Sequence, residues 1–296
     1  MTQVGWIGLG AMGRPMAARL LETGHEVTAY DIDPGAVSAL GERAKGAASG
    51  AEAAAGSEVL AVMVATPAQV EDALFGDQGA VSALDEGSVV LVMATVGPTV
   101  VEGLTERLAE RGVHVVDAPV SGGVARATTG DLLMMVSGPE PALDRVRPLL
   151  DAMASTAPVV GPAPGDGQKV KLVNQLLCGV HIAAAGEALG YAQALGLDPG
   201  VVYETIRHGA AGSFMFDDRG RRMVAREFEE ARSALDIFVK DLGLVTAAAA
   251  AERFPATLAS AANALFLMGS ALGFGKEDDS GIVRVFEQWA TRRPGA

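Results

Sequence analysis

The chain has 296 residues, a length typical of about two domains. Hydrophobic residues make up 49% of it and charged residues 20%, which excludes intrinsic disorder because such a chain can bury a large core. The formal net charge of −13 at pH 7 argues against a nucleic-acid-binding surface, because that surface requires a basic face.

The sequence contains only weak signals for secretion or for insertion into a membrane. Cys178 is the only cysteine, so no intramolecular disulfide can form, as is typical of a reducing cytosol. No secretory signal is recognisable before the first strand-like segment. Residues 254–275 carry no charge and are long enough to span a bilayer, but Pro255, Asn263 and many small residues favour a buried helix. We therefore expect a cytoplasmic protein.

A glycine motif follows the first predicted strand. Val4–Gly8 is typical of a short buried strand, residues 8–13 read Gly-Leu-Gly-Ala-Met-Gly, and Arg14–Leu21 has helical spacing. A Gly-x-Gly-x-x-Gly motif between a strand and a helix is the context of a dinucleotide-binding loop, whose phosphates meet the helix N-terminus. The expected cofactor-binding loop comprises Gly8, Leu9, Gly10, Ala11, Met12 and Gly13.

An acidic residue ends the second predicted strand, Glu26–Tyr30. Asp31 lies 18 residues beyond Gly13, close to the spacing of the carboxylate that binds the ribose hydroxyls of a dinucleotide. No arginine follows to bind a 2′-phosphate, so NAD is favoured over NADP. Alternatively, Asp31 is only a turn residue before Pro34.

Strands and helices continue to alternate. Glu58–Ala65, Ser88–Ala94 and His114–Asp117 are predicted strands, with helical patterns between them. This βαβ repetition predicts an α/β fold of the Rossmann type, with a doubly wound parallel sheet covered on both faces. In such sheets the loops after the carboxyl ends of the strands build the site.

Three of those loops contain candidate ligand-binding groups. Ala65, Thr66 and Thr95 are expected near the nicotinamide end of the cofactor, although either threonine could instead only cap a helix. Ser121, Gly122 and Gly123 offer a hydroxyl and backbone N–H groups that suit a carboxylate, although they could also form an ordinary glycine turn.

A cluster of polar side chains opens the second half. Lys171, Asn174 and Gln175 are spaced i, i+3 and i+4, so they share one face of a helix that runs from Lys171 to about Leu195. The alternative is a helix end whose Lys169 and Lys171 reach water. Nothing else in the chain offers a better base for removing a proton from a hydroxyl group.

The remaining polar segments suggest structural roles. Arg219, Arg221, Arg222 and Arg226 are interpreted as mostly a solvated face, and residues 278–280 as a helix cap. No metal site is expected, because the four histidines lack partners at ligand spacing. They are His25, His114, His181 and His208.

Four segments in order resemble the β-hydroxyacid dehydrogenase family. They are Gly8–Met16, Asp117–Gly123, Gly165–Asn174 and Lys240–Gly243. The resemblance implies an NAD-binding Rossmann domain over 1–163 and an all-helical C-terminal domain over 164–296. The second domain would begin with a long interdomain helix over 167–195 and form a homodimer or homotetramer.

The resemblance also implies roles for single residues. Lys171 matches the family's catalytic lysine and Asn174 its substrate-binding amide. Thr95 and Lys240 match positions that contact the cofactor. The substrate would be bound by the family's serine–glycine loop and by neighbouring pocket residues. These are Ser121, Gly122, Gly123, Gln175 and Phe214.

The second half is most similar to family members that oxidise a four-carbon sugar acid such as L-threonate. It departs from them at Asn174, where they carry histidine, and at Phe214, where they carry tryptophan. We therefore expect NAD-dependent oxidation of a small hydroxy acid. The alternatives are a 3-hydroxyisobutyrate dehydrogenase, a tartronate semialdehyde reductase, and an NAD-binding sensor or scaffold without turnover.

Overall fold

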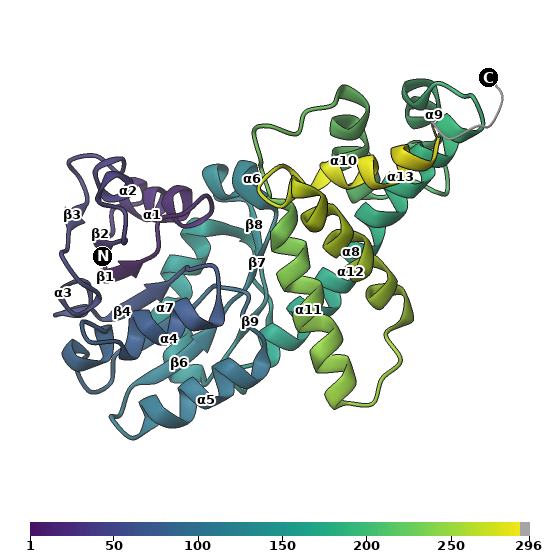
Figure 1. Cartoon of the computed structure of the whole chain (residues 1–296). Coiled ribbons are helices and arrows are strands. Elements are labelled where there is room, and N and C mark those ends of the chain that lie inside the picture. The colour runs from purple at the N-terminus through teal and green to yellow at the C-terminus, as the bar shows by residue number, and fades with distance from the viewer. Residues whose placement is uncertain (291–296) are drawn as a thin grey trace. The chain divides into compact units, whose positions relative to one another are not determined.

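The computed structural model describes residues 1–290 and divides into two compact units. Unit 1 comprises Met1–Lys171, and unit 2 begins at Leu172. Each unit has its own hydrophobic core. Figure 1 shows that unit 1 combines a sheet with helices, whereas unit 2 is helical.

Unit 1 is built on an eight-stranded sheet in the order β11-β9-β6-β5-β4-β1-β2-β3. Every pair is parallel except β6 with β9. Its strands are β1 (Gln3–Ile7), β2 (Glu26–Tyr30), β3 (Lys45–Gly46), β4 (Val59–Val62), β5 (Val89–Val92), β6 (His114–Asp117), β9 (Val136–Ser137) and β11 (Val159–Gly161). A smaller sheet contains β10 (Ala154–Thr156), β8 (Leu132–Met134) and β7 (Val120–Ser121).

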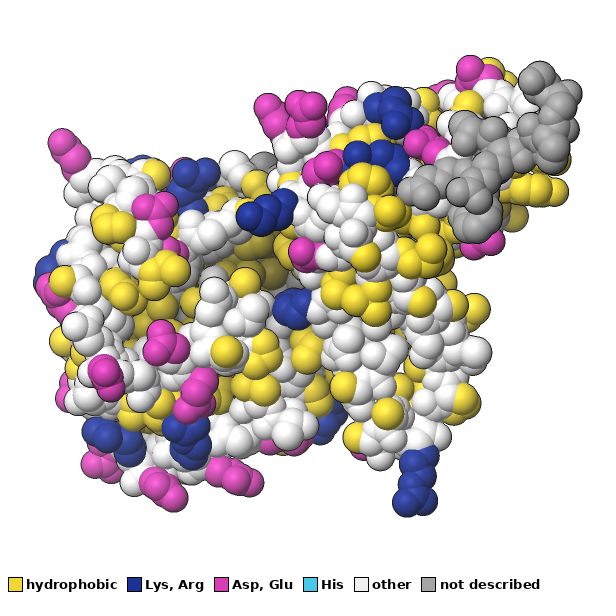
Figure 2. Space-filling model, viewed as in Figure 1, with side chains coloured by type: hydrophobic (Ala, Val, Ile, Leu, Met, Phe, Trp, Pro, Cys, Tyr) yellow, Lys and Arg dark blue, Asp and Glu magenta, His cyan; other side chains and the backbone are white. Residues whose placement is uncertain are grey.

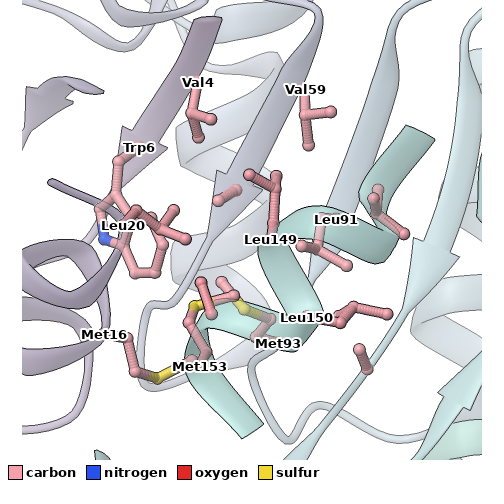
Figure 3. Close-up of a cluster of buried hydrophobic side chains, with 14 of the residues drawn as sticks. Val4, Trp6, Met16, Leu20, Val59, Leu91, Met93, Leu149, Leu150 and Met153 are labelled. Atoms are coloured by element: carbon pink, nitrogen blue, oxygen red, sulfur yellow. The ribbon is translucent and has the colours of Figure 1, made fainter. Parts of the chain in front are cut away.

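Helices cover both faces of the large sheet (Figure 1). They are α1 (Gly13–Glu22), α2 (Pro34–Ser38), α3 (Gly50–Ala54), α4 (Pro67–Phe75), the 3₁₀ helix η1 (Ala80–Ala83), α5 (Pro98–Ala109), α6 (Gly123–Thr129) and α7 (Glu140–Met153). Side chains alternate along each strand, so Val59 and Leu60 enter different cores. In Figure 3, Trp6 of β1 lies against Leu20 of α1, in the core that α7 also covers.

Unit 2 contains the rest of α8 (Asp166–Ala194), a 29-residue helix that begins in unit 1. Its other helices are α9 (Pro199–Ile206), α10 (Phe214–Ala225), α11 (Leu235–Ala251), α12 (Thr257–Gly269), the π-helical turn η2 (Ser270–Phe274), the 3₁₀ helix η3 (Asp279–Ile282) and α13 (Val283–Ala290). Small residues let these helices approach closely. A Cβ on Gly179 would lie 2.8 Å from the Leu242 side chain of α11.

The expected fold class is confirmed, and two local interpretations are corrected. The arginine run is a solvated face only in part: the side chains of Arg221 and Arg226 are 45% and 56% exposed, whereas Arg222 is buried and pairs with the buried Asp278 and with Asp218. The uncharged segment 254–275 is not buried within one chain, since Phe254 and Leu258 are 62% and 69% exposed. Asp278 does act as a cap, but of the 3₁₀ helix η3.

Two helices in residues 1–290 are long and apolar enough to cross a membrane by length and composition. They are α8 and the segment Thr257–Phe274. A core helix passes the same test, and half of the α8 window is buried.

Candidate active site

The glycine loop after β1 is tightly packed on one side and open on the other. Gly8 has a φ of 97°, and its carbonyl oxygen accepts a hydrogen bond of 2.8 Å from the Trp6 indole. A Cβ on Gly13 would collide with that carbonyl oxygen, so helix and strand pack closely only with glycine there. A Cβ on Gly10 would meet no atom within 4 Å. The open side therefore lies where a dinucleotide pyrophosphate must approach the backbone.

The N-terminus of α1 fits an anion. No side chain caps this helix at Met12, and its first turn contains no acidic residue. Within the loop, Ala11 is exposed and the Leu9 side chain is buried. The uncapped N–H groups and the positive end of the helix dipole suit a bound phosphate.

Asp31 follows β2 and is hydrogen-bonded to the glycine loop. Its Oδ2 accepts from the Leu9 backbone N–H at 2.6 Å, and its Oδ1 accepts from the Asp33 N–H at 2.9 Å. Each carboxylate oxygen keeps a further lone pair for a ribose hydroxyl. The next residue, Ile32, is exposed and offers no positive charge to a 2′-phosphate.

Three loops follow neighbouring strands at the same edge of the sheet. Thr66 is the N-cap of α4: its hydroxyl accepts from the Gln69 N–H at 3.2 Å, and Gln69 Oε1 accepts from the N–H groups of Ala65 and Thr66. The capping of α4 therefore uses both the hydroxyl and the backbone N–H of Thr66. Thr95 is half-buried between β5 and α5.

The serine–glycine loop has unusual backbone geometry. Ser121 ends β7, and the next two glycines have φ values of 136° and 70°. A Cβ on Gly122 would lie 3.0 Å from Arg126, whereas a Cβ on Gly123 would meet no atom within 4 Å. Both positions require the conformational freedom of glycine.

A buried carboxylate holds the start of α8. Asp117, the last residue of β6, accepts hydrogen bonds of 2.8 Å from the Gly165 and Gln168 N–H groups. The Ser137 hydroxyl donates to Asp117 and accepts from the Gly167 N–H at 2.9 Å. Burial raises the pKa of Asp117 to about 6, while these hydrogen bonds act to lower it. The sequence pattern gives no signal for this network.

The buried side chain of Gln168 was also missed. Its Oε1 accepts from the Val96 and Gly97 N–H groups at 3.0 and 3.1 Å, and its Nε2 donates to the Ala94 carbonyl at 3.0 Å. Lys171 lies one turn further along α8, 6% exposed. It is the last residue of unit 1, which also holds the glycine loop, Thr66, Thr95 and Ser121.

Unit 2 brings together three of its four predicted site residues. Asn174 Nδ2 donates to Gln175 Oε1 at 2.9 Å, and Gln175 Nε2 donates to the buried Asp241 at 2.5 Å. Lys240 Nζ lies 2.9 Å from the other oxygen of Asp241. Asp241, for which the sequence contains no separate signal, links these residues. The fourth, Phe214, begins α10 and is exposed.

Two family models match the chain. The NAD-binding domain of 6-phosphogluconate dehydrogenase matches residues 3–161, and the NAD-binding domain of NADP-dependent 3-hydroxyisobutyrate dehydrogenase matches residues 165–286. The glycine loop, the uncapped α1 and Asp31 fit NAD, so the expected cofactor agrees with the family and with this structure. Within residues 1–290, no group of three or more potential metal ligands is found.

Relatives with assigned activities match nearly the whole chain. The L-threonate dehydrogenase of Cupriavidus necator is 43% identical over 285 residues, which cover 96% of this chain and 95% of the relative. The 2-hydroxy-3-oxopropionate reductase of Escherichia coli is 32% identical, with coverage of 98% and 99%. The crystal structure of 3-hydroxyisobutyrate dehydrogenase from Salmonella typhimurium is 40% identical, with a TM-score of 0.90 and coverage of 96% and 100%.

Identities of 32% to 43% over nearly the whole chain are too high to arise by chance. These relatives are named as dehydrogenases or as a reductase. The chain belongs to the β-hydroxyacid dehydrogenase family of NAD-dependent oxidoreductases.

Proposed function

We propose that this dehydrogenase oxidises L-threonate or a closely similar four-carbon sugar acid, with Lys171 as the general acid and base. The observation that carries the substrate assignment is the 43% identity to an L-threonate dehydrogenase over 96% of the chain. The similarity to a 3-hydroxyisobutyrate dehydrogenase is nearly as high, at 40%, so the two substrates must be compared directly.

The chemistry needs a group that takes the proton of the hydroxyl being oxidised. NAD, when bound, accepts the hydride. Lys171 is buried, and a buried amine loses its charge more readily than an exposed one. Its neutral amine removes the hydroxyl proton, and in the reverse direction its ammonium returns that proton to the carbonyl oxygen.

Asn174 supports the reacting hydroxyl. Its Nδ2 donates to Gln175 and lies 3.4 Å from the Cys178 sulfur, so its Oδ1 is the atom directed to a ligand hydroxyl. The chain from Asp241 through Gln175 fixes this amide orientation. Ser121, Gly122 and Gly123 bind the substrate carboxylate through a hydroxyl and backbone N–H groups.

The cofactor is held by the glycine loop, from Gly8 to Gly13, and by Asp31. Ala65, Thr66, Thr95 and Lys240 surround its nicotinamide end. The single cysteine and the use of NAD favour a cytoplasmic location.

Substrate choice follows from pocket polarity. A four-carbon sugar acid presents additional hydroxyls, whereas 3-hydroxyisobutyrate presents a methyl group. Ser121, Asn174 and Gln175 supply more hydrogen-bonding groups than a methyl requires. A site built to pair hydroxyls rejects analogues that lack them, because its own polar groups are then left unpaired.

The test compares initial rates with L-threonate, 3-hydroxyisobutyrate and 2-hydroxy-3-oxopropionate, followed by NADH absorbance. We expect kcat/KM for L-threonate to exceed that for 3-hydroxyisobutyrate by at least about a hundredfold, roughly 2.7 kcal/mol of transition-state binding. Equal or reversed values would discard the threonate assignment and leave the family assignment intact.

A further inference from the structure

We infer that Gln168 is a positioning residue, which fixes Lys171 relative to the loop that carries Thr95. The inference rests on the proposed role of Lys171. It adds a residue that touches neither substrate nor cofactor and acts through the backbone of two site segments.

Both the oxygen and the nitrogen of the Gln168 side-chain amide form hydrogen bonds to the backbone. Its oxygen accepts two backbone hydrogen bonds, from Val96 at 3.0 Å and Gly97 at 3.1 Å, and its nitrogen donates to Ala94 at 3.0 Å. The side chain is fully buried. Only one orientation of the amide satisfies all three groups, because the reverse would place donor against donor. The backbone on both sides of Thr95 is therefore held by one side chain.

Gln168 and Lys171 lie on the same helix, α8, so the contacts that fix the position of Gln168 also fix that of Lys171. Lys171 stands at i+3 from Gln168, so the two side chains are neighbours on the helix surface, roughly 5–6 Å apart at Cβ. A shift of this first turn relative to residues 94–97 would move Lys171 by a similar amount.

A second anchor prevents the first turn from pivoting about Gln168. Asp117 and Ser137 together accept the N–H groups of Gly165, Gly167 and Gln168. A Cβ on Gly167 would collide with the Met135 carbonyl oxygen, so only glycine permits this close approach. All these bonds lie within unit 1, which ends at Lys171. Lys171 is thus tied to the cofactor-binding unit, and Asn174 belongs to unit 2.

The functional consequence is a rate effect. A misplacement of about 1 Å at a reacting group can cost about 10²-fold in rate. The first variant is Gln168→Met, which keeps the length of the side chain and removes its hydrogen bonds. The matched control is Gln193→Met, the same change near the other end of α8. We expect Gln168→Met to lower kcat at least about tenfold with the Kd for NAD changed less than about threefold, and the control to match wild type.

Gln168→Glu gives a signature that a general loss of stability would not produce. A protonated glutamic acid reproduces the amide's one donor and its acceptor, whereas the ionised form places a negative oxygen against the Ala94 carbonyl. The ratio of kcat for Gln168→Glu to kcat for wild type should therefore rise at least about fivefold as pH falls from 9 to 6.5.

The inference is overturned if Gln168→Met retains kcat within about threefold of wild type. It is also overturned if the variant weakens NAD binding while leaving kcat unchanged, or if the Gln168→Glu ratio is flat with pH. Lys171→Ala is measured in parallel. An active Lys171→Ala would refute the proposed function, whereas an inactive Lys171→Ala beside an active Gln168→Met would refute this inference alone.

Discussion

At the residue scale, two lysines near the start of α8 have different surroundings. The Lys169 side chain is 55% exposed and pairs with Asp166 at 3.0 Å and Glu102 at 3.4 Å. Lys171 is 6% exposed. The alternative interpretation, in which both lysines reach water, therefore fits Lys169 and does not fit Lys171.

This contrast supplies a matched pair of variants. Lys171→Ala should bind NAD normally and lose turnover by several orders of magnitude, since general acid–base catalysis alone contributes 10²–10⁴-fold. Lys169→Ala should keep near wild-type turnover, because it removes only exposed ion pairs. The measurements are kcat with L-threonate and NAD affinity by fluorescence titration. More than about a tenth of wild-type activity in Lys171→Ala would remove this lysine from the mechanism.

Asp31 should determine the choice between NAD and NADP. In the proposed role, its carboxylate accepts from the ribose hydroxyls and repels a 2′-phosphate. Asp31→Ala should therefore weaken NAD binding and narrow the ratio of kcat/KM for NAD over NADP. Glu26→Ala, at the opposite end of β2, is the control and should leave that ratio unchanged. A wild-type enzyme that uses NADP as efficiently as NAD would contradict this role.

The sequence predicted those site residues that belong to a motif of neighbouring positions. The glycine motif and the polar spacing around Lys171 could be identified because their members lie within a few positions of one another. Gln168, Asp117 and Asp241 were missed because their partners are distant in the chain. Asp117 and Gly165, for example, are 48 positions apart. A buried polar residue next to a catalytic candidate carries no periodic signal.

At the element scale, short apolar segments separated by helical patterns predicted the strands of unit 1, though not their lengths. β4 and β5 are four residues each, shorter than the predicted segments, because hydrophobic residues continue past the point where pairing ends. In unit 2, the pairing of Arg222 with Asp278 could not be read from charge patterning. The two residues are 56 positions apart, and a basic run usually marks a solvated face.

The junction of β6 and α8 makes stability depend on pH. The folded pKa of Asp117 is raised to about 6 from 3.8, so the folded state binds a proton that the unfolded state releases. The free energy of unfolding therefore contains a contribution that is present below about pH 4 and is lost as pH rises through 6. A shift of about two pKa units corresponds to on the order of 3 kcal/mol.

Asp117→Asn isolates that contribution because asparagine does not titrate. As pH falls from about 7 to 4, wild type should gain stability relative to the variant, by on the order of 3 kcal/mol. Urea unfolding at several pH values measures the difference. Other acidic groups titrate in both proteins, so they cancel in the comparison. Parallel pH profiles would show that the carboxyl of Asp117 is not perturbed.

At the scale of the whole molecule, unit 2 has more apolar surface than its own core buries. Hydrophobic side chains are visible over α11 and α12 in Figure 2. Leu267 and Met268 of α12 are 49% and 45% exposed, and Leu272 of η2 is similarly exposed. Only 22% of the apolar window Thr257–Phe274 is buried. The sequence predicted this helix and its apolar character, but periodicity cannot distinguish a core within one chain from an interface.

We expect a second copy of the chain to cover this surface, so the protein should be at least a homodimer. Contiguous apolar patches larger than a few hundred Å² are rare on monomers, and a symmetric dimer buries the same patch on both copies. Sedimentation at micromolar concentration should therefore give about twice the mass of one chain or more. Leu267→Glu should shift the protein toward monomer, because it places a charge in a desolvated contact. Val159→Glu, a similarly exposed apolar position on β11 of unit 1, should leave the mass unchanged. A wild-type monomer at that concentration would contradict the expectation, and dissociation by both variants alike would place the interface elsewhere than on α12.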